Sequence, residues 1–217
     1  MLSLKPTQKR AFPARFRSCA SAIAMTEFAL VLPLFTMIGL SGLEVANFTL
    51  ANLKISQMAL NLADLASRLG QSNSLGVKTI REVDINNAFQ AMRLQAGTLP
   101  VTTKGRVILS SIERVSGAQK ITWQRCLGQG TYSSSYGTAG NTPIGVGVTA
   151  ADDTTAIMFV EIQYQYQPLI SNRLMGAKVI KTKASFIVRD KRDLTTTNNP
   201  GNPSPSVVGS TCNLFNA

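Results

Sequence analysis

One acidic residue lies near the start of a long apolar segment. The stretch Ala24–Leu40 reads AMTEFALVLPLFTMIGL, and Glu27 is the only charged residue from Ser18 to Leu43. An ionised carboxylate inside a membrane helix costs roughly 2.5–3.5 kcal/mol on insertion scales, so acids at such positions usually have a functional reason. Glu27 is therefore the first candidate functional residue.

Few other residues have the types and spacing that catalysis or metal binding needs. The chain has no histidine, which removes the commonest general base and the commonest zinc ligand. Asp152-Asp153 supplies at most half a calcium site, and we interpret the pair as solvated loop acids. Gly128-Gln129-Gly130 lacks the third glycine and the strand-to-helix context of a dinucleotide-binding turn. We therefore predict a protein that is not an enzyme, with no cofactor and no metal.

Positive charge is concentrated at the N-terminus. The chain has 22 Lys and Arg against 11 Asp and Glu, and five of the basic residues lie in residues 1–22, which contain no acid. We find no dense basic patch in the rest of the chain, whereas a nucleic-acid binder clusters its charge on one element. The prediction is that the protein has no nucleic-acid partner.

The apolar segment Ile23–Leu43 is long enough to cross a bilayer, which takes about 20 residues. Basic residues before it and none directly after it place the N-terminus in the cytoplasm and the rest of the chain outside. A cleaved secretory signal is the alternative, because it also has a basic start and an apolar run. The run is long for a signal, and no clear A-x-A site follows it.

The helix is expected to continue beyond the membrane. Five apolar residues recur at steps of three and four: Ile55, Met58, Leu62, Leu65 and Leu69. This period predicts one apolar stripe on an amphipathic helix. Gly70 supplies a C-terminal stop, so we expect a single helix from Ser21 to Leu69.

Later in the chain a helical period gives way to a period of two. A second helix is predicted at 78–96, with one apolar face made of Ile85, Phe89, Met92 and Ala96. Strands are predicted at 106–115, 119–126, 158–166 and 180–188, of which 158–166 alternates as a half-buried strand does. Helices followed by strands predict an α+β fold, with an antiparallel sheet of about four strands that covers the helices on one face.

These patterns divide the chain into five segments. They are a basic cytoplasmic leader (1–22), a transmembrane helix (23–45), its amphipathic extension (46–70), an extracytoplasmic α+β domain (71–193) and an Asn/Pro/Ser/Thr-rich tail (194–217).

Two of the three cysteines, Cys126 and Cys212, fall on the outer side of the membrane in the predicted orientation, where disulfides form. A bridge between them would tether the tail to the second strand, and closing such a loop is credited with roughly 4 kcal/mol. Two unpaired thiols are the alternative. Cys19 lies in the leader and is not expected to join them.

The start of the chain resembles a known family. A small residue, four further residues, then Glu27-Phe28 and an unbroken apolar helix is similar to the start of type IV pilins. The segment Ala24–Leu34, AMTEFALVLPL, more closely resembles the TadE-like minor pilins of the tight-adherence (Flp) pilus system. The resemblance implies cleavage by a prepilin peptidase between Ala22 and Ile23, which makes Glu27 the fifth residue of the mature chain. The family pattern favours glycine where this chain has Ala22.

The resemblance and the chemistry of the carboxylate together suggest an assembly role for Glu27. After cleavage the new amine of Ile23 would carry a positive charge. Pairing it with Glu27 of a neighbouring subunit would offset the cost of burying the carboxylate and fix the stagger of the packed helices. The alternative is that Glu27, near the cytoplasmic boundary, reaches the interface without a partner.

The expected function is that of a minor-pilin-like protein, anchored in a bacterial inner membrane, for assembly of tight-adherence pili. Its expected partners are the membrane, pilin and pilus-assembly proteins, and a prepilin peptidase. One alternative is an uncleaved bitopic scaffold of an envelope secretion system, which keeps residues 1–22. An enzyme of the cell envelope is a further alternative, against which the missing histidine and the isolated acids count.

Overall fold

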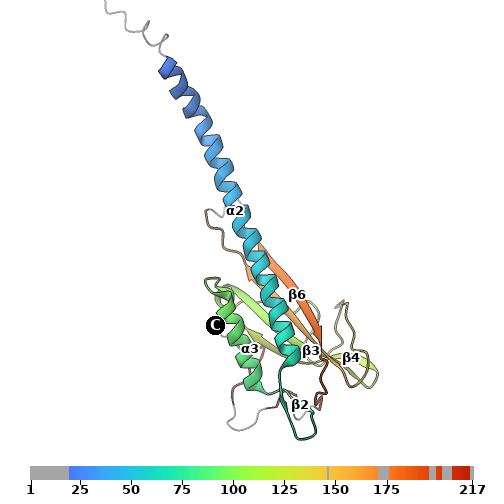
Figure 1. Cartoon of the computed structure of the whole chain (residues 1–217). Helices are drawn as coiled ribbons and strands as arrows, with labels where there is room; N and C mark the ends of the chain where they lie inside the picture. Colours follow the sequence, from blue (N-terminus) through green and yellow to red (C-terminus); the bar gives the residue numbers. More distant parts are fainter. Residues whose placement is uncertain (1–19, 146, 171–175, 196–198, 202–206, 216–217) are drawn as a thin grey trace, which may run out of the picture. The chain divides into compact units, whose positions relative to one another are not determined.

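The structure is a computed structural model that describes residues 20–145, 147–170, 176–195, 199–201 and 207–215. Most of the predicted leader and parts of the predicted tail lie outside these residues. The chain divides between Ala46 and Asn47 into two compact units. The first unit contains the start of the long helix α2, Ala20–Arg68, and the second contains its remainder and every other described element (Figure 1).

Helix α2 is continuous through Pro33, as the sequence predicts. Within the second unit its buried face consists of Ala51, Ile55, Met58, Ala59, Leu62, Ala63 and Ala66. Three of the five predicted stripe residues belong to this face, but Leu65 is exposed and Leu69 is only partly buried. The alanines replace them because small side chains allow a helix to lie close to the surface it packs on.

The second helix is shorter than the predicted range 78–96. The elements in this region are β1 (Gln71–Ser72), β2 (Lys78–Thr79) and α3 (Glu82–Ala96), and β1 pairs with β2. The backbone amide of Arg81 donates a hydrogen bond to the carboxylate of Asp84 (3.2 Å), which fixes the helix start at this point. The predicted apolar face is confirmed, because all four of its residues are buried.

Four strands form one antiparallel sheet in the order β4-β3-β5-β6. Their bounds are Gly105–Val115 (β3), Ala118–Leu127 (β4), Ala156–Gln165 (β5) and Val179–Ile187 (β6), and a short helix α4, Val101–Lys104, precedes them. The β3–β4 turn is Ser116-Gly117, with φ of 52° and 83°, a left-handed pair that suits a tight hairpin. The predicted α+β class and four-stranded antiparallel sheet are confirmed.

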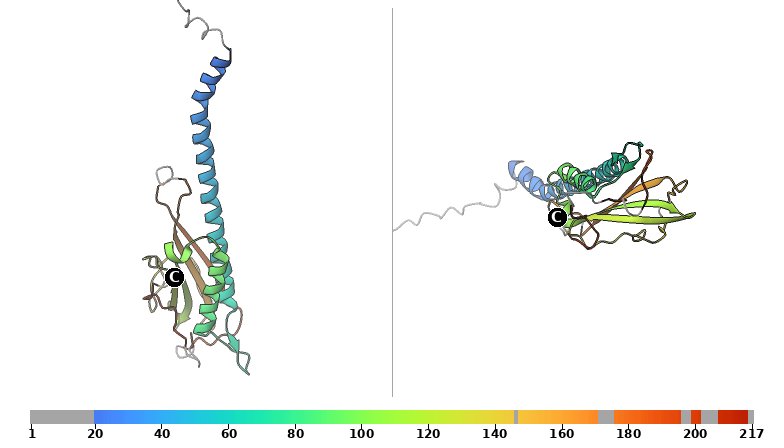
Figure 2. Two further views of the ribbon diagram at one scale, coloured as in Figure 1. Left: turned by 90° about the vertical axis from the view of Figure 1, so that its left-hand side faces the viewer. Right: turned by 90° about the horizontal axis from the view of Figure 1, so that it is seen from below.

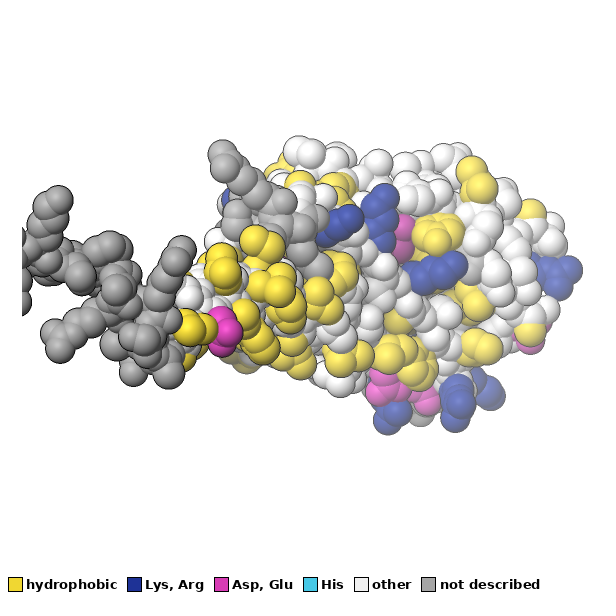
Figure 3. Space-filling model, turned by 90° about the horizontal axis from the view of Figure 1, so that it is seen from above, with side chains coloured by type: hydrophobic (Ala, Val, Ile, Leu, Met, Phe, Trp, Pro, Cys, Tyr) yellow, Lys and Arg dark blue, Asp and Glu magenta, His cyan; other side chains and the backbone are white. Residues whose placement is uncertain are grey.

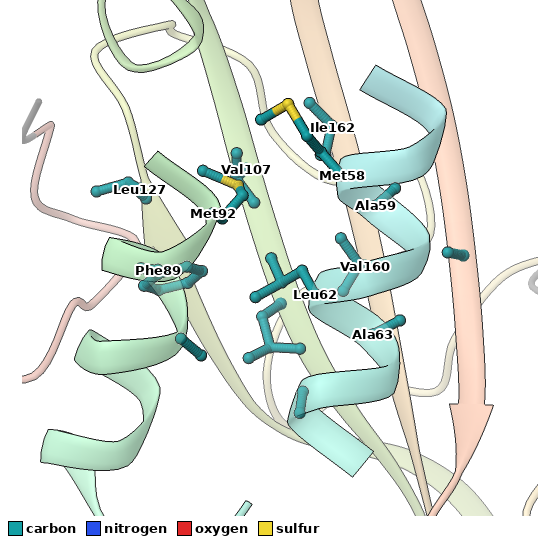
Figure 4. Close-up of a cluster of buried hydrophobic side chains, with 14 of the residues drawn as sticks. Met58, Ala59, Leu62, Ala63, Phe89, Met92, Val107, Leu127, Val160 and Ile162 are labelled. Carbon is teal, nitrogen blue, oxygen red and sulfur yellow. The ribbon is translucent and has the colours of Figure 1, made fainter. Parts of the chain in front are cut away.

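Helices α2 and α3 lie on the same face of the sheet (Figure 2). Figure 4 shows side chains that fill the space between the helices and the sheet, including Met58, Leu62, Phe89, Met92, Val107, Val160 and Ile162. None of these is more than 3% exposed. Full burial of one large apolar side chain contributes about 1.5–3 kcal/mol, so this layer is the main core of the second unit.

The opposite face of the sheet is also covered, which the sequence analysis did not predict. The connection between β4 and β5, residues 128–155, contributes Tyr136, Val148 and Ala150 to a second apolar cluster. Its sheet residues are Ile112, Ile121, Ile157 and Phe159. Nine of the ten residues of β5 are buried as a result, so the prediction of a half-buried strand is wrong.

Because only one face of α2 packs in the core, replacing two leucines of this helix should have very different effects on the free energy of unfolding. Leu62 is 2% exposed and Leu50 is 64% exposed. Leu62→Ala should lower the free energy of unfolding by roughly 2–5 kcal/mol, because it leaves a cavity. Leu50→Ala should change it by less than about 0.5 kcal/mol. Denaturant unfolding of the detergent-solubilised full chain, followed by the fluorescence of buried Trp123, measures both. Equal losses in the two variants would contradict the assigned face of α2.

Candidate functional site

The first unit is an apolar helix whose side chains are exposed. Every large apolar side chain from Ile23 to Leu43 is at least 43% exposed. The most apolar 18-residue window of the helix has a mean hydropathy of 1.9, and none of it is buried. Figure 3 shows hydrophobic side chains gathered in this region. By length and composition this helix is a candidate membrane span, and its exposure distinguishes it from the core helix of a soluble domain.

Glu27 differs from the other polar residues of this segment. Three hydroxyl side chains donate to backbone carbonyls of their own helix: Thr26 to Ile23, Thr36 to Pro33 and Ser41 to Met37, at 2.7–2.9 Å. They are therefore satisfied without any partner outside the helix. Glu27 is exposed and makes no hydrogen bond or ion pair with a described residue. In lipid its carboxylate would require a cation or interfacial water.

The predicted cleavage position lies at the start of α2. Both Ala22 and Ile23 are helical in the structure, and the side chain of Ile23 is 53% exposed. Ile23 precedes Glu27 by four residues, so the two lie one turn apart on the same side of the helix. An amine formed at Ile23 would therefore lie on the same side of the helix as the carboxylate.

Cys126 and Cys212 form a disulfide, as predicted. It joins β4 to the tail, and two further interactions hold the same segment. The amide of Cys126 donates to the carbonyl of Ser210 (2.7 Å), and the hydroxyl of Ser210 donates to the side-chain oxygen of Asn86 on α3 (2.7 Å). The last described part of the tail, 207–215, is thus fastened to both β4 and α3.

Arg106 is a second anchor for the tail, and the sequence analysis missed it. Its side chain is 1% exposed and donates to the backbone carbonyls of Gly128, Cys212 and Leu214. Its guanidinium also lies 4.3 Å from the ring centroid of Phe215. Burial lowers the pKa of Arg106, while the carbonyls and the ring face stabilise the charge. The sequence signal was a lone arginine at the start of an apolar strand.

The glycine pair that resembles part of a nucleotide-binding turn has a packing role. The amide of Gly130 donates to the carbonyl of Gly105 (2.9 Å). A Cβ at Gly128, where φ is 107°, would lie 2.5 Å from the same carbonyl oxygen. Glycine at 128 therefore lets the chain cross closely over the start of β3.

One buried acid invites comparison with a catalytic carboxylate. Glu161 is 4% exposed and accepts hydrogen bonds from the hydroxyl of Ser134 and the amide of Ser135. Burial raises the pKa of Glu161, and these hydrogen bonds and the charge of Lys183 oppose that rise. The adjacent hollow of about 160 Å³ is lined by no second acid. Because its partners are serines of the 128–155 connection, the carboxylate serves to hold that connection on the sheet.

Metal binding has no support in the described part of the chain, which contains no group of three His, Cys, Asp or Glu that could hold an ion. Asp152 accepts hydrogen bonds from the amide and the hydroxyl of Thr154, and these lower its pKa. Asp153 lies 3.8 Å from Arg114. Both acids are exposed, and Asp152 stabilises its own turn, which fits loop acids.

A second concentration of positive charge, in residues 178–193, was not predicted from the sequence. Residues 178–193 contain six Lys and Arg and only two Asp. The signal is the local net charge: it is high in this segment, but it is averaged out when residues 23–217 are taken together. Most of these cations are exposed, namely Lys178, Lys181, Lys183, Arg189 and Lys191.

Arg192 is the buried member of that segment, at 7% exposure. Its guanidinium donates to the carbonyls of Ala66, Ser67 and Leu69, at the C-terminal end of α2. Burial lowers the pKa of Arg192 to about 10, so it remains charged at neutral pH. A cation at this end of a helix satisfies free carbonyls and complements the helix dipole. Arg192 therefore ties the last strand region to α2.

Comparisons with known proteins do not place the chain in a family. No family model, no curated protein and no solved structure matches it.

The tail anchors predict unequal roles for the cysteines. Cys212→Ser should lower the free energy of unfolding by roughly 2–5 kcal/mol, because it frees a tail that the disulfide tethers. Cys19→Ser, the matched control, should change it by less than about 0.5 kcal/mol. Denaturant unfolding of the full chain in detergent measures both. A Cys212→Ser protein that unfolds at the wild-type midpoint would show that Arg106 and Ser210 hold the tail unaided.

Proposed function

We propose that this chain is a membrane-anchored, minor-pilin-like protein that takes part in assembly of tight-adherence pili and has no catalytic activity. The observation that carries the proposal is the exposed apolar helix with Glu27 as its only charged residue from Ile23 to Leu43. The resemblance of Ala24–Leu34 to TadE-like minor pilins supports the same function. The anchor would lie in a bacterial inner membrane, with the N-terminus in the cytoplasm.

The proposed mechanism is packing of apolar helices directed by one charge pair. Between helices in lipid there is no hydrophobic driving force, so close packing and polar contacts determine which helices associate. Glu27 would accept the N-terminal amine of a neighbouring subunit. Leaving a buried charge without its partner costs about 3–5 kcal/mol, which is enough to select one stagger of the helices over others.

The second unit would then lie outside the cytoplasm and make contacts with other proteins. The Cys126–Cys212 disulfide supports this location, because such bonds persist in oxidising compartments. The buried anchors Arg106 and Arg192 support a rigid unit suited to contacts rather than to a moving lid.

The first test is the N-terminal residue of the mature protein, measured by mass spectrometry of the membrane fraction of its own host. We expect Ile23, which prepilin-type processing would produce. An intact Met1 would instead support the uncleaved scaffold, and Ala22 in the place of the favoured glycine makes this the main competitor. A start beyond Leu43 would mean a cleaved signal and would overturn the membrane proposal.

A second test concerns the charge of Glu27. Glu27→Gln keeps the size of the side chain but removes the partner of the amine, so recovery of pilin with the protein should fall about tenfold or more, while membrane association is kept. Asp153→Asn removes the same charge from an exposed loop and should leave recovery unchanged. Affinity purification from host membranes measures both. Normal recovery with Glu27→Gln would assign the carboxylate to the membrane interface alone.

A further inference from the structure

The two edges of the sheet are not equivalent. At one edge, the amide of Cys126 in β4 donates to the tail at Ser210, so the tail covers part of that edge. At the other edge lies β6, which among the described strands pairs with β5 alone (Figure 1). No described residue forms a backbone hydrogen bond with the outer side of β6. An edge strand with free amides and carbonyls is a template for another strand.

The register identifies the free backbone groups. The amide of Val188 donates to Ala156, and that of Tyr166 donates to Lys178, so these two pairs are hydrogen-bonded ones. Hydrogen-bonded and non-hydrogen-bonded pairs alternate along an antiparallel ladder. The outward amides and carbonyls of β6 therefore belong to its odd-numbered residues, which are Val179, Lys181, Lys183, Ser185 and Ile187.

The side chains of the same strand favour a partner of particular chemistry. Lys181 and Lys183 are exposed on the face away from the helices, and Arg189 follows two residues after the strand. Arg189 makes no hydrogen bond or ion pair with a described residue. Opposite charges on neighbouring strands stabilise the pairing of the strands, and like charges destabilise it. An acidic strand therefore fits this edge.

The helix side of the edge is apolar instead. The hydroxyls of Ser56 on α2 and Thr182 on β6 lie 3.5 Å apart, so Ser56 marks the flank of α2 that faces β6. Leu53 and Leu60, one turn before and after Ser56, lie on the same side of the helix and are 56% and 49% exposed. Phe186 of β6, on the helix side of the sheet, is 37% exposed. A strand added here would bring every second side chain toward these apolar groups.

A hollow marks the end of this edge. It has a volume of about 740 Å³, and its lining includes Ser67 and Arg68 of α2 together with Ser185, Phe186 and Ile187 of β6. The acids in its wall already have partners, since Asp64 pairs with Arg68 and Asp190 with Lys78. The unpaired charge that remains there is the cation Arg189.

We propose that the outer edge of β6, together with the flank of α2 around Leu53 and Leu60, binds an extended segment of a partner protein by strand addition. The segment alternates acidic residues, which face Lys181 and Lys183, with apolar residues, which face α2. Main-chain hydrogen bonds supply affinity in this mode, and alternate side chains supply specificity. The proposed function suggests pilus-assembly proteins as the source of the segment, and to that extent the inference rests on it.

A second copy of the same edge fits poorly in an antiparallel pair. Full antiparallel overlap of β6, Val179–Ile187, with itself would set Lys183 opposite Lys183 of the other copy on one face of the sheet, where like charges repel. The edge lysines thus disfavour this self-association and favour an acidic partner.

The test uses the full chain in detergent and a fluorescent synthetic peptide of about ten residues, matched to the length of β6, in which Glu and Val alternate. We expect saturable binding by fluorescence anisotropy, with slower hydrogen exchange at the amides of residues 181, 183, 185 and 187. Lys181→Glu with Lys183→Glu should weaken binding about tenfold or more and should bind a Lys/Val peptide instead. The control, Lys104→Glu with Lys120→Glu, makes the same charge change at exposed lysines elsewhere and should stay within about twofold.

The backbone part of the proposal has its own variant. Ser185→Pro removes one outward amide without breaking a bond to β5, so it should weaken binding, whereas Ser185→Thr should not. If Ser185→Pro does not fold, amide protection in the wild-type chain decides the same point.

Three results would overturn the inference: no saturable binding, equal binding by the charge-reversed chain, or binding without protection of the four amides. If heparin displaced the peptide and the four amides were not protected, the lysines would form only a general anion-binding patch, and the inference would again be overturned. The peptide test uses unprocessed protein, so its result does not depend on cleavage before Ile23 or on Glu27. Failure of this test can therefore be distinguished from failure of the proposed function, which the mature N-terminal residue and Glu27→Gln test.

Discussion

The second unit depends on close packing of the alanine-rich face of α2 against the sheet. Ala59, Ala63 and Ala66 leave room for the helix to lie near the strands, while Met58 and Leu62 fill the space toward α3. Arg192 then holds the last turn of α2 through its free carbonyls. With this layer formed, one face of the sheet is closed, and Gln57, Asn61 and Arg68 of α2 remain exposed.

The opposite face of the sheet is covered by irregular chain, and buried backbone groups outside helices and strands need other hydrogen-bond partners. Charged side chains supply such partners. Arg106 binds carbonyls of the tail, and Glu161 binds the 128–155 connection. On the helix side of the sheet, Glu113 likewise accepts hydrogen bonds from Ser111, Thr122 and Asn199. The Arg125–Glu82 ion pair joins β4 to the start of α3. A buried charge is costly unless it is paired and hydrogen-bonded, so each of these residues specifies one position for its segment.

The two units therefore present opposite surfaces. The first has exposed apolar side chains from Ile23 to Leu43, and the second has a filled core, exposed cations in residues 178–191, and a strand edge that no described residue covers. In the proposed function, the first unit anchors the protein and the second makes contacts with other proteins. Among the described residues, Glu161 is a buried acid with a raised pKa, and its hydrogen-bond partners belong to the connection that covers the sheet.

The sequence by itself determined the long helix, the strand periods, the position of Glu27 and the pairing of Cys126 with Cys212, because each depends on local periodicity, on charge or on the small number of cysteines. It failed where distant segments meet. The first turns of the predicted second helix became β2 because β1 was available to pair with it. Strand β5 was predicted to be half-buried, but nine of its ten residues are buried because residues 128–155 fold over it. The anchoring by Arg106, the strand order and the free edge of β6 were decided only by the tertiary structure, since each depends on residues far apart in the chain that no local pattern brings together.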